Sequence, residues 1–326
     1  MARTLTLIVT LLGFTSTIAR AQSDYYNRDA GRPSRIEDAS PTPRYELELQ
    51  LAPLRFEKLE SGVQRWRVEP KMAYGIAPFT DVEIRVPYIA VNAPDSPRKS
   101  GIGGIAIGAL HAFGLENAAR PAFALSGEWI APVGGLSAPI GSYTIKGIAT
   151  KTFAQMRVHA NVAYGTYSSK VSVCALPRPI NVPPPEECAP NVIPFDPPCD
   201  RVPAADGVAA MAAQCLARAE TREEEQPFDP LRTVGMRWLA GAGIDHAFAL
   251  SSTLLTADVV AERFAGLFAR TDVSAEIGLR HQVTPQLVLE IGAGRHFVGL
   301  LRSNSATVGI GYGVATPRLF PHRGPR

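Results

Sequence analysis

The residues best placed to do chemistry are charged side chains that alternate with apolar ones along short segments. In the segment from Val63 to Tyr88, for example, Trp66 and Val68 alternate with Arg65 and Arg67. Successive side chains of a β-strand point to opposite faces, so each such segment predicts a strand with one apolar and one charged face. The charged faces supply the candidate site residues Arg65, Arg67, Lys71, Asp81, Glu83, Arg85, Glu128, Arg157, His159, Glu276 and Arg280.

Motifs for enzymatic chemistry are missing from the sequence. It contains no H-E-x-x-H, G-x-S-x-G or P-loop pattern, and its six histidines are scattered. Gly101-x-Gly103-x-x-Ala106 matches a dinucleotide fingerprint, but an alternating strand follows it instead of the helix that the fingerprint needs. We therefore predict no catalytic residue, metal or cofactor. His159 and Asn161 share a face, which leaves an outer-membrane lipase as an enzymatic alternative, although no serine motif accompanies them.

The first 21 residues have the features of a secretory signal peptide. They contain Arg3, an apolar stretch from Leu5 to Ile18, and the cleavage pattern Ala19-Arg20-Ala21. Removing them lowers the formal charge from +3 to +1, since Arg3 and Arg20 are lost and no acid. Such balanced charge does not indicate a nucleic-acid partner, which would require a concentrated basic patch.

The rest of the chain predicts an all-β protein. No apolar run approaches the roughly 18 residues of a spanning helix, so a membrane-spanning form must be a closed sheet. We predict a disordered segment over 22–43, a barrel over 44–314 and a tail over 315–326. About twelve strands are expected near 45–51, 65–74, 81–88, 104–113, 123–129, 144–153, 156–164, 233–244, 252–262, 272–280, 286–296 and 305–314.

The connections between these segments alternate in length. Short ones are predicted at 77–80, 114–120, 153–155, 246–250 and 282–285, and long ones at 52–62, 92–103, 131–143, 168–232, 265–271 and 297–304. Short periplasmic turns and longer outer loops are typical of an outer-membrane barrel with both chain ends in the periplasm. The alternation therefore predicts a transmembrane antiparallel up-and-down barrel with an even number of strands.

Periodicity alone does not show which face meets lipid, because a soluble all-β protein also alternates with its apolar face inward. Two features favour the membrane barrel. Several polar faces carry charges of both signs, as a lumen would. Aromatic residues also gather toward the strand ends, where they meet the membrane interface: Trp66, Tyr74, Tyr88, Trp129, Tyr164, Trp238 and Tyr312.

The long loop at 168–232 is predicted on the outer side. It holds all four cysteines, and an exported chain meets oxidising conditions, so two disulfides are expected. Spacing does not separate the three possible pairings, of which neighbour pairing is the simplest. The loop is either an outer lid or constriction held in shape by disulfides, or a variable surface excursion without a transport role. The disulfide candidates are Cys174, Cys188, Cys199 and Cys215.

Several short motifs occur in a recognisable order. The run from Tyr74 to Tyr88 is followed by the glycine-rich 101–108 and by Trp129-Ile-Ala-Pro-Val-Gly134, and Asn161-Val-Ala-Tyr-Gly165 comes later. In this order the chain resembles the outer-membrane transporters associated with the meta-pathway of phenol degradation, over about 45–167 and more loosely over 233–314. Gly104 replaces the acidic residue that commonly follows the G-x-G of that family, the cysteine loop is not expected there, and Val314 replaces a final aromatic residue. The resemblance implies a barrel for small hydrophobic solutes, although the charged polar face fits polar solutes as well.

Together these features predict an outer-membrane channel for passive passage of small molecules. Its expected partners are outer-membrane lipid, the barrel-assembly machinery and a small solute, and its oligomeric state stays open. The opposed inward charges either line a narrow path or pair and close it, and both alternatives stand. A structural or adhesive surface barrel without transport is the alternative from another functional class.

Overall fold

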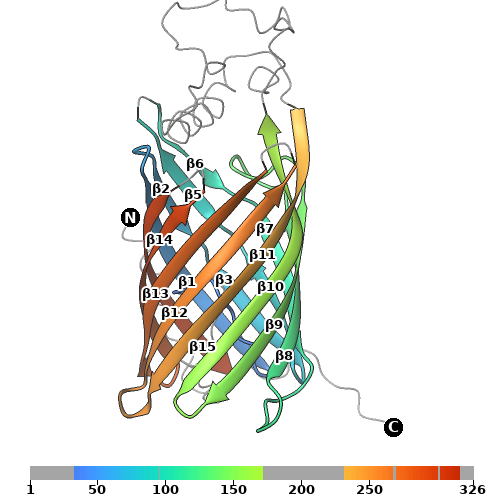
Figure 1. The fold of residues 1–326 in the computed structure, drawn as a ribbon, viewed down its shortest axis with the longest axis vertical. Helices are drawn as coiled ribbons and strands as arrows, with labels where there is room; N and C mark the ends of the chain where they lie inside the picture. Colours follow the sequence, from blue (N-terminus) through green and yellow to red (C-terminus); the bar gives the residue numbers. More distant parts are fainter. Residues whose placement is uncertain (1–32, 95, 172–230, 267–268, 300–301, 316–326) are drawn as a thin grey trace, which may run out of the picture.

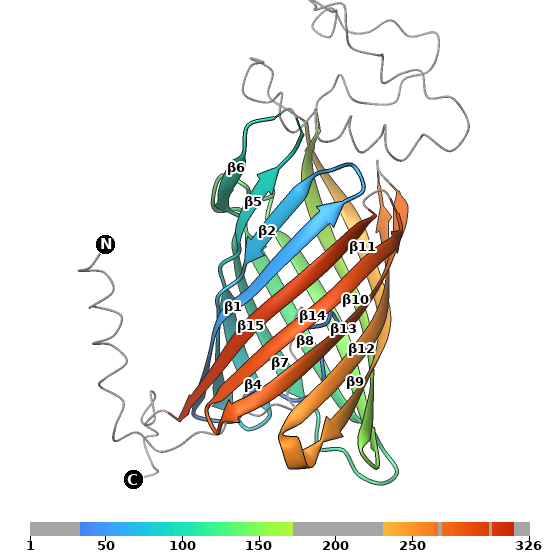
Figure 2. The same ribbon diagram turned by 90° about the vertical axis from the view of Figure 1, so that its left-hand side faces the viewer.

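The chain forms a closed antiparallel β-barrel (Figure 1). The computed structural model describes residues 33–94, 96–171, 231–266, 269–299 and 302–315. Neighbouring strands pair in sequence order from β7 onward, and β15 pairs with β1 over 46–59 to close the sheet, as Figure 2 shows. Closure joins the two ends of the sheet, which is the condition for a sheet to cross a membrane. The prediction of a twelve-strand up-and-down barrel is therefore confirmed.

Nine of the barrel strands are continuous and three are interrupted. The continuous ones are β1 (Glu46–Leu59), β8 (Ala122–Ala131), β9 (Ser142–Phe153), β10 (Met156–Val171), β11 (Leu231–Phe248), β12 (Thr253–Ala265), β13 (Arg270–Thr284), β14 (Leu287–Val298) and β15 (Ser303–Ala315). The interrupted ones are β2 (Gln64–Val68) with β3 (Lys71–Ala77), β4 (Thr80–Arg85) with β5 (Tyr88–Asn92), and β6 (Lys99–Ile102) with β7 (Ile105–Ala112).

The three interruptions have local causes. Pro70 and Pro87 have no N–H to donate to a ladder, and Gly104 has a φ of +120°. The chain bridges the breaks with backbone hydrogen bonds from Val86 N to Pro70 O (3.1 Å) and from Gly103 N to Pro87 O (2.8 Å). The barrel wall therefore stays continuous where the ladders stop.

The two faces of the sheet differ as the alternation predicted. Outward side chains are large, apolar and exposed, as with Ile145, Val259 and Ile291, whereas inward ones include buried Asp258, Thr256 and other polar groups. An exposed apolar band outside and a polar interior are the arrangement of a membrane barrel. The protein is accordingly an outer-membrane barrel, and the soluble alternative with apolar faces inward is wrong. Within the described residues, no helix is long and apolar enough to span a membrane.

Three expectations about the strands and their connections were wrong. β1 continues through most of the predicted loop 52–62, because a register shift between Gln50 and Ala52 changes the phase of alternation and hides the continuation. β6 lies inside the predicted connection 92–103. Connection length also does not alternate strictly, since 60–63 is short and 113–121 is long. The end of the barrel carrying the turns at 78–79, 113–121, 154–155, 249–252 and 285–286 is called the turn end, and the other is called the loop end.

The longest connection at the turn end is ordered by polar contacts. Glu116 accepts hydrogen bonds from the N–H and hydroxyl of Thr152 (2.7 Å each) and lies 3.1 Å from the ammonium of Lys151. Burial acts to raise the pKa of the Glu116 carboxyl group, but the contacts with Thr152 and Lys151 outweigh it and hold that pKa below its usual value.

Several predicted features lie outside the described residues. These are the signal peptide 1–21, residues 22–32 of the predicted disordered segment, 172–230 of the cysteine loop with all four cysteines, and 316–326 of the tail. They stay predictions.

Candidate functional site

The site is the barrel lumen together with the segment that runs through it. Residues 33–44, called the strap, precede β1 and run along the inner wall, from Glu262 in the loop-end half of β12 to Asp81 at the turn end. Within the strap, Ser34, Ile36 and Asp38 are almost fully buried. The expectation of disorder over 22–43 is therefore wrong for 33–43. Its contacts come mostly from residues more than one hundred positions away in sequence, which local composition does not reveal.

The wall holds the strap mainly by its backbone. Asn161 makes a two-way contact, in which its Oδ1 accepts from Glu37 N and its Nδ2 donates to Glu37 O, both at 2.9 Å. Three more wall oxygens accept strap N–H groups, in the pairs Ile36–Asp258 (2.8 Å), Ala39–Thr150 (3.0 Å) and Thr42–Asp81 (2.7 Å). Buried backbone N–H groups need such partners, so these four wall side chains fix the path of the strap.

Ion pairs add to this anchoring. Arg35 contacts Glu262 at 2.8 Å, and Glu37 accepts from the ammonium of Lys146. Asp38 lies 3.2 Å from Arg157, so the strap carries charges of both signs that meet opposite charges on the wall. Breaking a buried pair by removing one partner is costly, which makes these pairs specific anchors.

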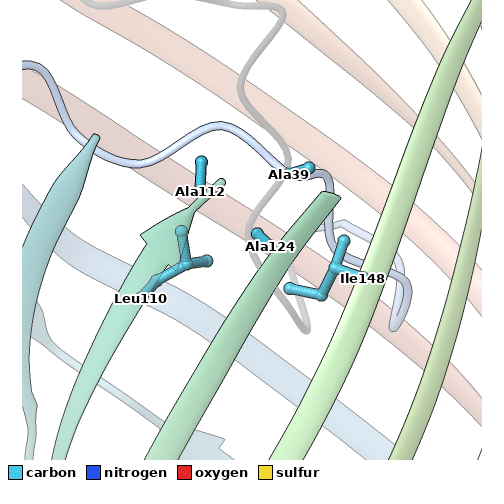
Figure 3. Close-up of a cluster of buried hydrophobic side chains, with 5 residues drawn as sticks. All are labelled: Ala39, Leu110, Ala112, Ala124 and Ile148. Carbon is cyan, nitrogen blue, oxygen red and sulfur yellow. The ribbon is translucent and has the colours of Figure 1, made fainter. Parts of the chain in front are cut away.

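An apolar cluster of wall residues packs against the middle of the strap (Figure 3). Ala39 lies against the inward side chains of Leu110 and Ala112 on β7, Ala124 on β8 and Ile148 on β9, all nearly inaccessible to solvent. The inner wall of β7 to β9 thus has an apolar patch that surrounds Ala39 beside the polar contact with Thr150.

Glycines make room for the strap. A Cβ added to Gly278 would overlap the ring of Pro33, and one added to Gly292 would lie 2.8 Å from Pro33 Cβ. On β11, a Cβ added to Gly241 would lie 2.6 Å from Ile36 Cδ1. The wall is therefore hollowed where the strap approaches it most closely.

We expect Gly278→Val to displace the strap while leaving the barrel closed, since its φ is not in the left-handed region. The measurement is maleimide labelling of a cysteine placed at Ser34, which is fully buried next to Pro33, with faster labelling expected in the variant. Gly127→Val is the matched control, because a Cβ there meets nothing within 4 Å. Equal labelling rates in the two variants would contradict the conclusion that Pro33 packs against Gly278 and holds the strap there.

A buried polar network lies beside the strap. His159 is inaccessible to solvent and contacts Thr150 through Nδ1 (3.0 Å) and Asp245 through Nε2 (2.8 Å). Arg157 binds both carboxylate oxygens of Asp245, at 3.0 and 2.9 Å. The arrangement places a hydroxyl, an imidazole and a carboxylate in series, as in a hydrolase. The Thr150 hydroxyl oxygen accepts from Ala39 N, however, so the geometry favours structural support over nucleophilic attack.

The remaining lumen charges lie mostly in pairs. Arg85 contacts Glu69 at 2.6 Å, Glu83 at 3.5 Å and Glu128. Further pairs are Arg55–Glu276 and Arg55–Glu57, Arg65–Glu57, Arg67–Glu69, Lys71–Glu83, Arg237–Glu262 and Arg280–Glu290. Most charges of the inner face thus meet an opposite charge on the wall or on the strap.

The structure places all eleven predicted site residues on the inner face. Arg85, Glu83, Glu128 and Lys71 form one group, and Arg157 and His159 form another. Asp81 holds the strap, Glu276 and Arg280 lie on the wall of β13, and Arg65 and Arg67 lie on β2. Sequence reasoning missed the anchors Glu37, Asp38, Lys146, Thr150, Asp258 and Glu262. For the anchors on the wall, the signal was a polar residue in the inward phase of a strand.

Comparison with known proteins shows similarity of fold. No family model and no curated protein matches the sequence. The solved COG4313 outer membrane channel from Pseudomonas putida F1 is 10% identical, covering 85% of this chain and 97% of that one with a TM-score of 0.50. The translocator domain of the autotransporter NalP from Neisseria meningitidis is 10% identical, with 82% of this chain and 87% of that one covered and a TM-score of 0.45. The KdgM porin is also 10% identical, with 82% of this chain and 98% of that one covered and a TM-score of 0.41. The likeness to the Pseudomonas channel gives this chain the fold of an outer-membrane β-barrel.

Proposed function

We propose that this protein is an outer-membrane channel for passive passage of small solutes and that the strap closes it. The observation that carries the proposal is the way the strap is held. It lies inside the lumen without being a strand of the sheet, and hydrogen bonds, ion pairs and one apolar seat retain it. If the strap left the lumen, these contacts would break, but the hydrogen-bond ladders between the barrel strands would stay intact.

The interior also suits passage once the strap is displaced. A barrel of eight strands is filled by its own side chains and one of sixteen holds an aqueous channel, so twelve strands leave an intermediate interior. Inward glycines at Gly241, Gly278 and Gly292 widen it where the strap now lies. The strap therefore occupies room that a solute could use.

The solute class we propose is small and hydrophobic or aromatic. The resemblance to transporters of the phenol meta-pathway implies it, and the similar protein from Pseudomonas putida F1 is an outer membrane channel. The apolar inner patch of Leu110, Ala124 and Ile148 supports it, because a hydrophobic solute would meet a complementary wall there. The paired charges nearer the loop end would favour polar solutes instead, so uptake of both kinds should be compared.

Bilayer recordings test the proposal. We expect low conductance from the wild-type protein and a several-fold increase from a double variant, Asn161→Leu with Asp258→Leu, that loses three strap hydrogen bonds. Both side chains become apolar groups of similar size, so the wall stays filled. A variant lacking 33–43 should show the same increase.

One result would contradict the channel, and another would contradict its closure by the strap. Heat-modifiable, folded barrels of both variants that conduct no more than the wild type would show that the paired charges, and not the strap, close the lumen. The structural or adhesive alternative would then be favoured. Ser126→Ala is on the inner face of β8 and removes none of the strap hydrogen bonds or ion pairs described above. An equal rise in conductance from it would show that the increase does not come from strap release.

A further inference from the structure

A row of polar residues crosses the outside of the barrel near the loop end. The row has one residue from each of five neighbouring strands, and each residue pairs in register with the next. In order around the barrel, they are Arg295 of β14, Asn304 of β15, Lys58 of β1, Gln64 of β2 and Asn92 of β5. Alternation puts these side chains on the outer face, and all except Gln64 are largely exposed. Figure 2 shows this side of the barrel.

The next outward row toward the turn end is apolar. It contains Ala293, Ala306, Phe56 and Trp66, and the last two rings pack with centroids 4.5 Å apart. Two residues along a strand span about 7 Å, so the surface changes from apolar to polar within one step. Longer loops of outer-membrane barrels face outward from the cell. The polar row therefore lies at the headgroup level of the outer leaflet.

The outer surface around the polar row has an excess of positive charge. Lys58, Arg295 and Arg302 are exposed cations, and the one acidic residue among them is Glu60. Glu60 is tied to Arg302 by a backbone hydrogen bond (Glu60 N to Arg302 O, 3.0 Å), and its carboxylate lies 3.5 Å from Arg295. That pair is more than half exposed on both sides, so it neutralises little. Lys58 and Arg302 form no ion pair within the described part of the chain.

The opposite side of the barrel differs at the loop end. The outward faces of β8 to β11 carry aromatic residues there: Trp129, Tyr143, Tyr164 and Trp238. Aromatic side chains at this level are expected of any membrane barrel. A cluster of three cations, two on β14 and β1 and one directly before β15, is not explained by that general requirement and indicates a particular anionic ligand.

We propose that Lys58, Arg295 and Arg302 bind the phosphate group of a phosphorylated lipid of the outer leaflet. Arginine forks and lysine ammonium groups are the usual protein ligands of phosphate. Acyl chains of the same lipid would lie along the apolar rows below, where Phe56, Val308 and Ile291 are outward. A phosphorylated lipid would contact both the cations and the apolar rows, whereas free phosphate would contact only the cations.

Native mass spectrometry of the purified full-length protein tests this site. Diphosphorylated lipid A is titrated into detergent-solubilised wild type and into a Lys58→Gln, Arg295→Gln, Arg302→Gln variant. We expect at least tenfold weaker retention by the variant. Lipid A with its phosphates removed should bind the wild type as weakly as the variant binds the intact lipid. The substituted side chains are exposed, and a heat-modifiability gel verifies that the variant is folded.

The matched control is Arg263→Gln, an outward arginine on β12 that donates to Thr271 at 3.3 Å and lies away from the cluster. It should retain lipid A like the wild type. Equal retention by the triple variant and the wild type would overturn the proposal. Inorganic phosphate displacing lipid A at equimolar concentration would also overturn it, because the apolar rows would then contribute nothing.

Discussion

Replacing Asp245 by leucine is expected to destabilise the barrel by about 3–5 kcal/mol, the usual cost of removing one partner of a buried ion pair. Asp245 accepts from both Arg157 and His159, and only about 1% of its side chain is exposed. Without it, Arg157 and His159 both lose a buried acidic partner, although the guanidinium still lies 3.2 Å from Asp38 of the strap. The loss should therefore exceed that of any exposed pair.

Urea titrations of protein refolded into lipid vesicles, with folded fractions read from heat-modifiable gels, measure this change. The double variant Arg157→Leu with Asp245→Leu should recover part of the loss, since it leaves no uncompensated guanidinium. Glu60→Leu is the exposed control, because its carboxylate lies 3.5 Å from Arg295 with more than half of both side chains exposed, and we expect a change below about 1 kcal/mol. A change of that small size for Asp245→Leu would mean that water enters the network and replaces the carboxylate.

How far sequence predicts this fold is clearest along β10. Its inward residues Arg157, His159 and Asn161 alternate with outward Val158, and the predicted segment 156–164 lies within the observed strand. Alternation succeeds here because lipid and lumen impose opposite polarity at every second residue. The same signal located strands in all twelve positions around the barrel.

Where alternation was interrupted, the prediction was wrong. β1 was cut short at Leu51 because the register shift beside it moves the following residues to the other phase. The short β6 was missed because four residues, Lys99–Ile102, are too few to establish a period. Both errors concern the half of the barrel where strands break at prolines and glycines.

The strap was beyond sequence reasoning for a different reason. Its polar and proline-containing composition, as in Ser34 to Arg44, is typical of a solvated segment, and its order comes from wall groups such as Asn161 and Asp258. A sequence shows that these wall groups face inward but does not show what they bind. The same limit applied to the lumen charges, whose pairing depends on register between strands.

The largest effect on ion selectivity is expected from Arg85→Glu. Arg85 is the cation shared by Glu69, Glu83 and Glu128, so its reversal gathers four acidic side chains at one level of the lumen. A ring of acidic side chains favours cations in a pore. We expect a several-fold rise in the permeability of potassium relative to chloride, measured as the reversal potential across a KCl gradient on the background lacking 33–43.

Glu128→Lys should shift the reversal potential in the opposite direction, because it adds a cation beside Arg85 and removes one of its acidic partners. The opposite signs separate an effect of lumen charge from general damage to the barrel, which would move both variants alike. Arg85→Gln should lie between the wild type and Arg85→Glu, since it removes the positive charge without adding a negative one. If none of the three variants moves the reversal potential while the barrels conduct, ions pass elsewhere and the Arg85 group serves to hold β4 and β8 together.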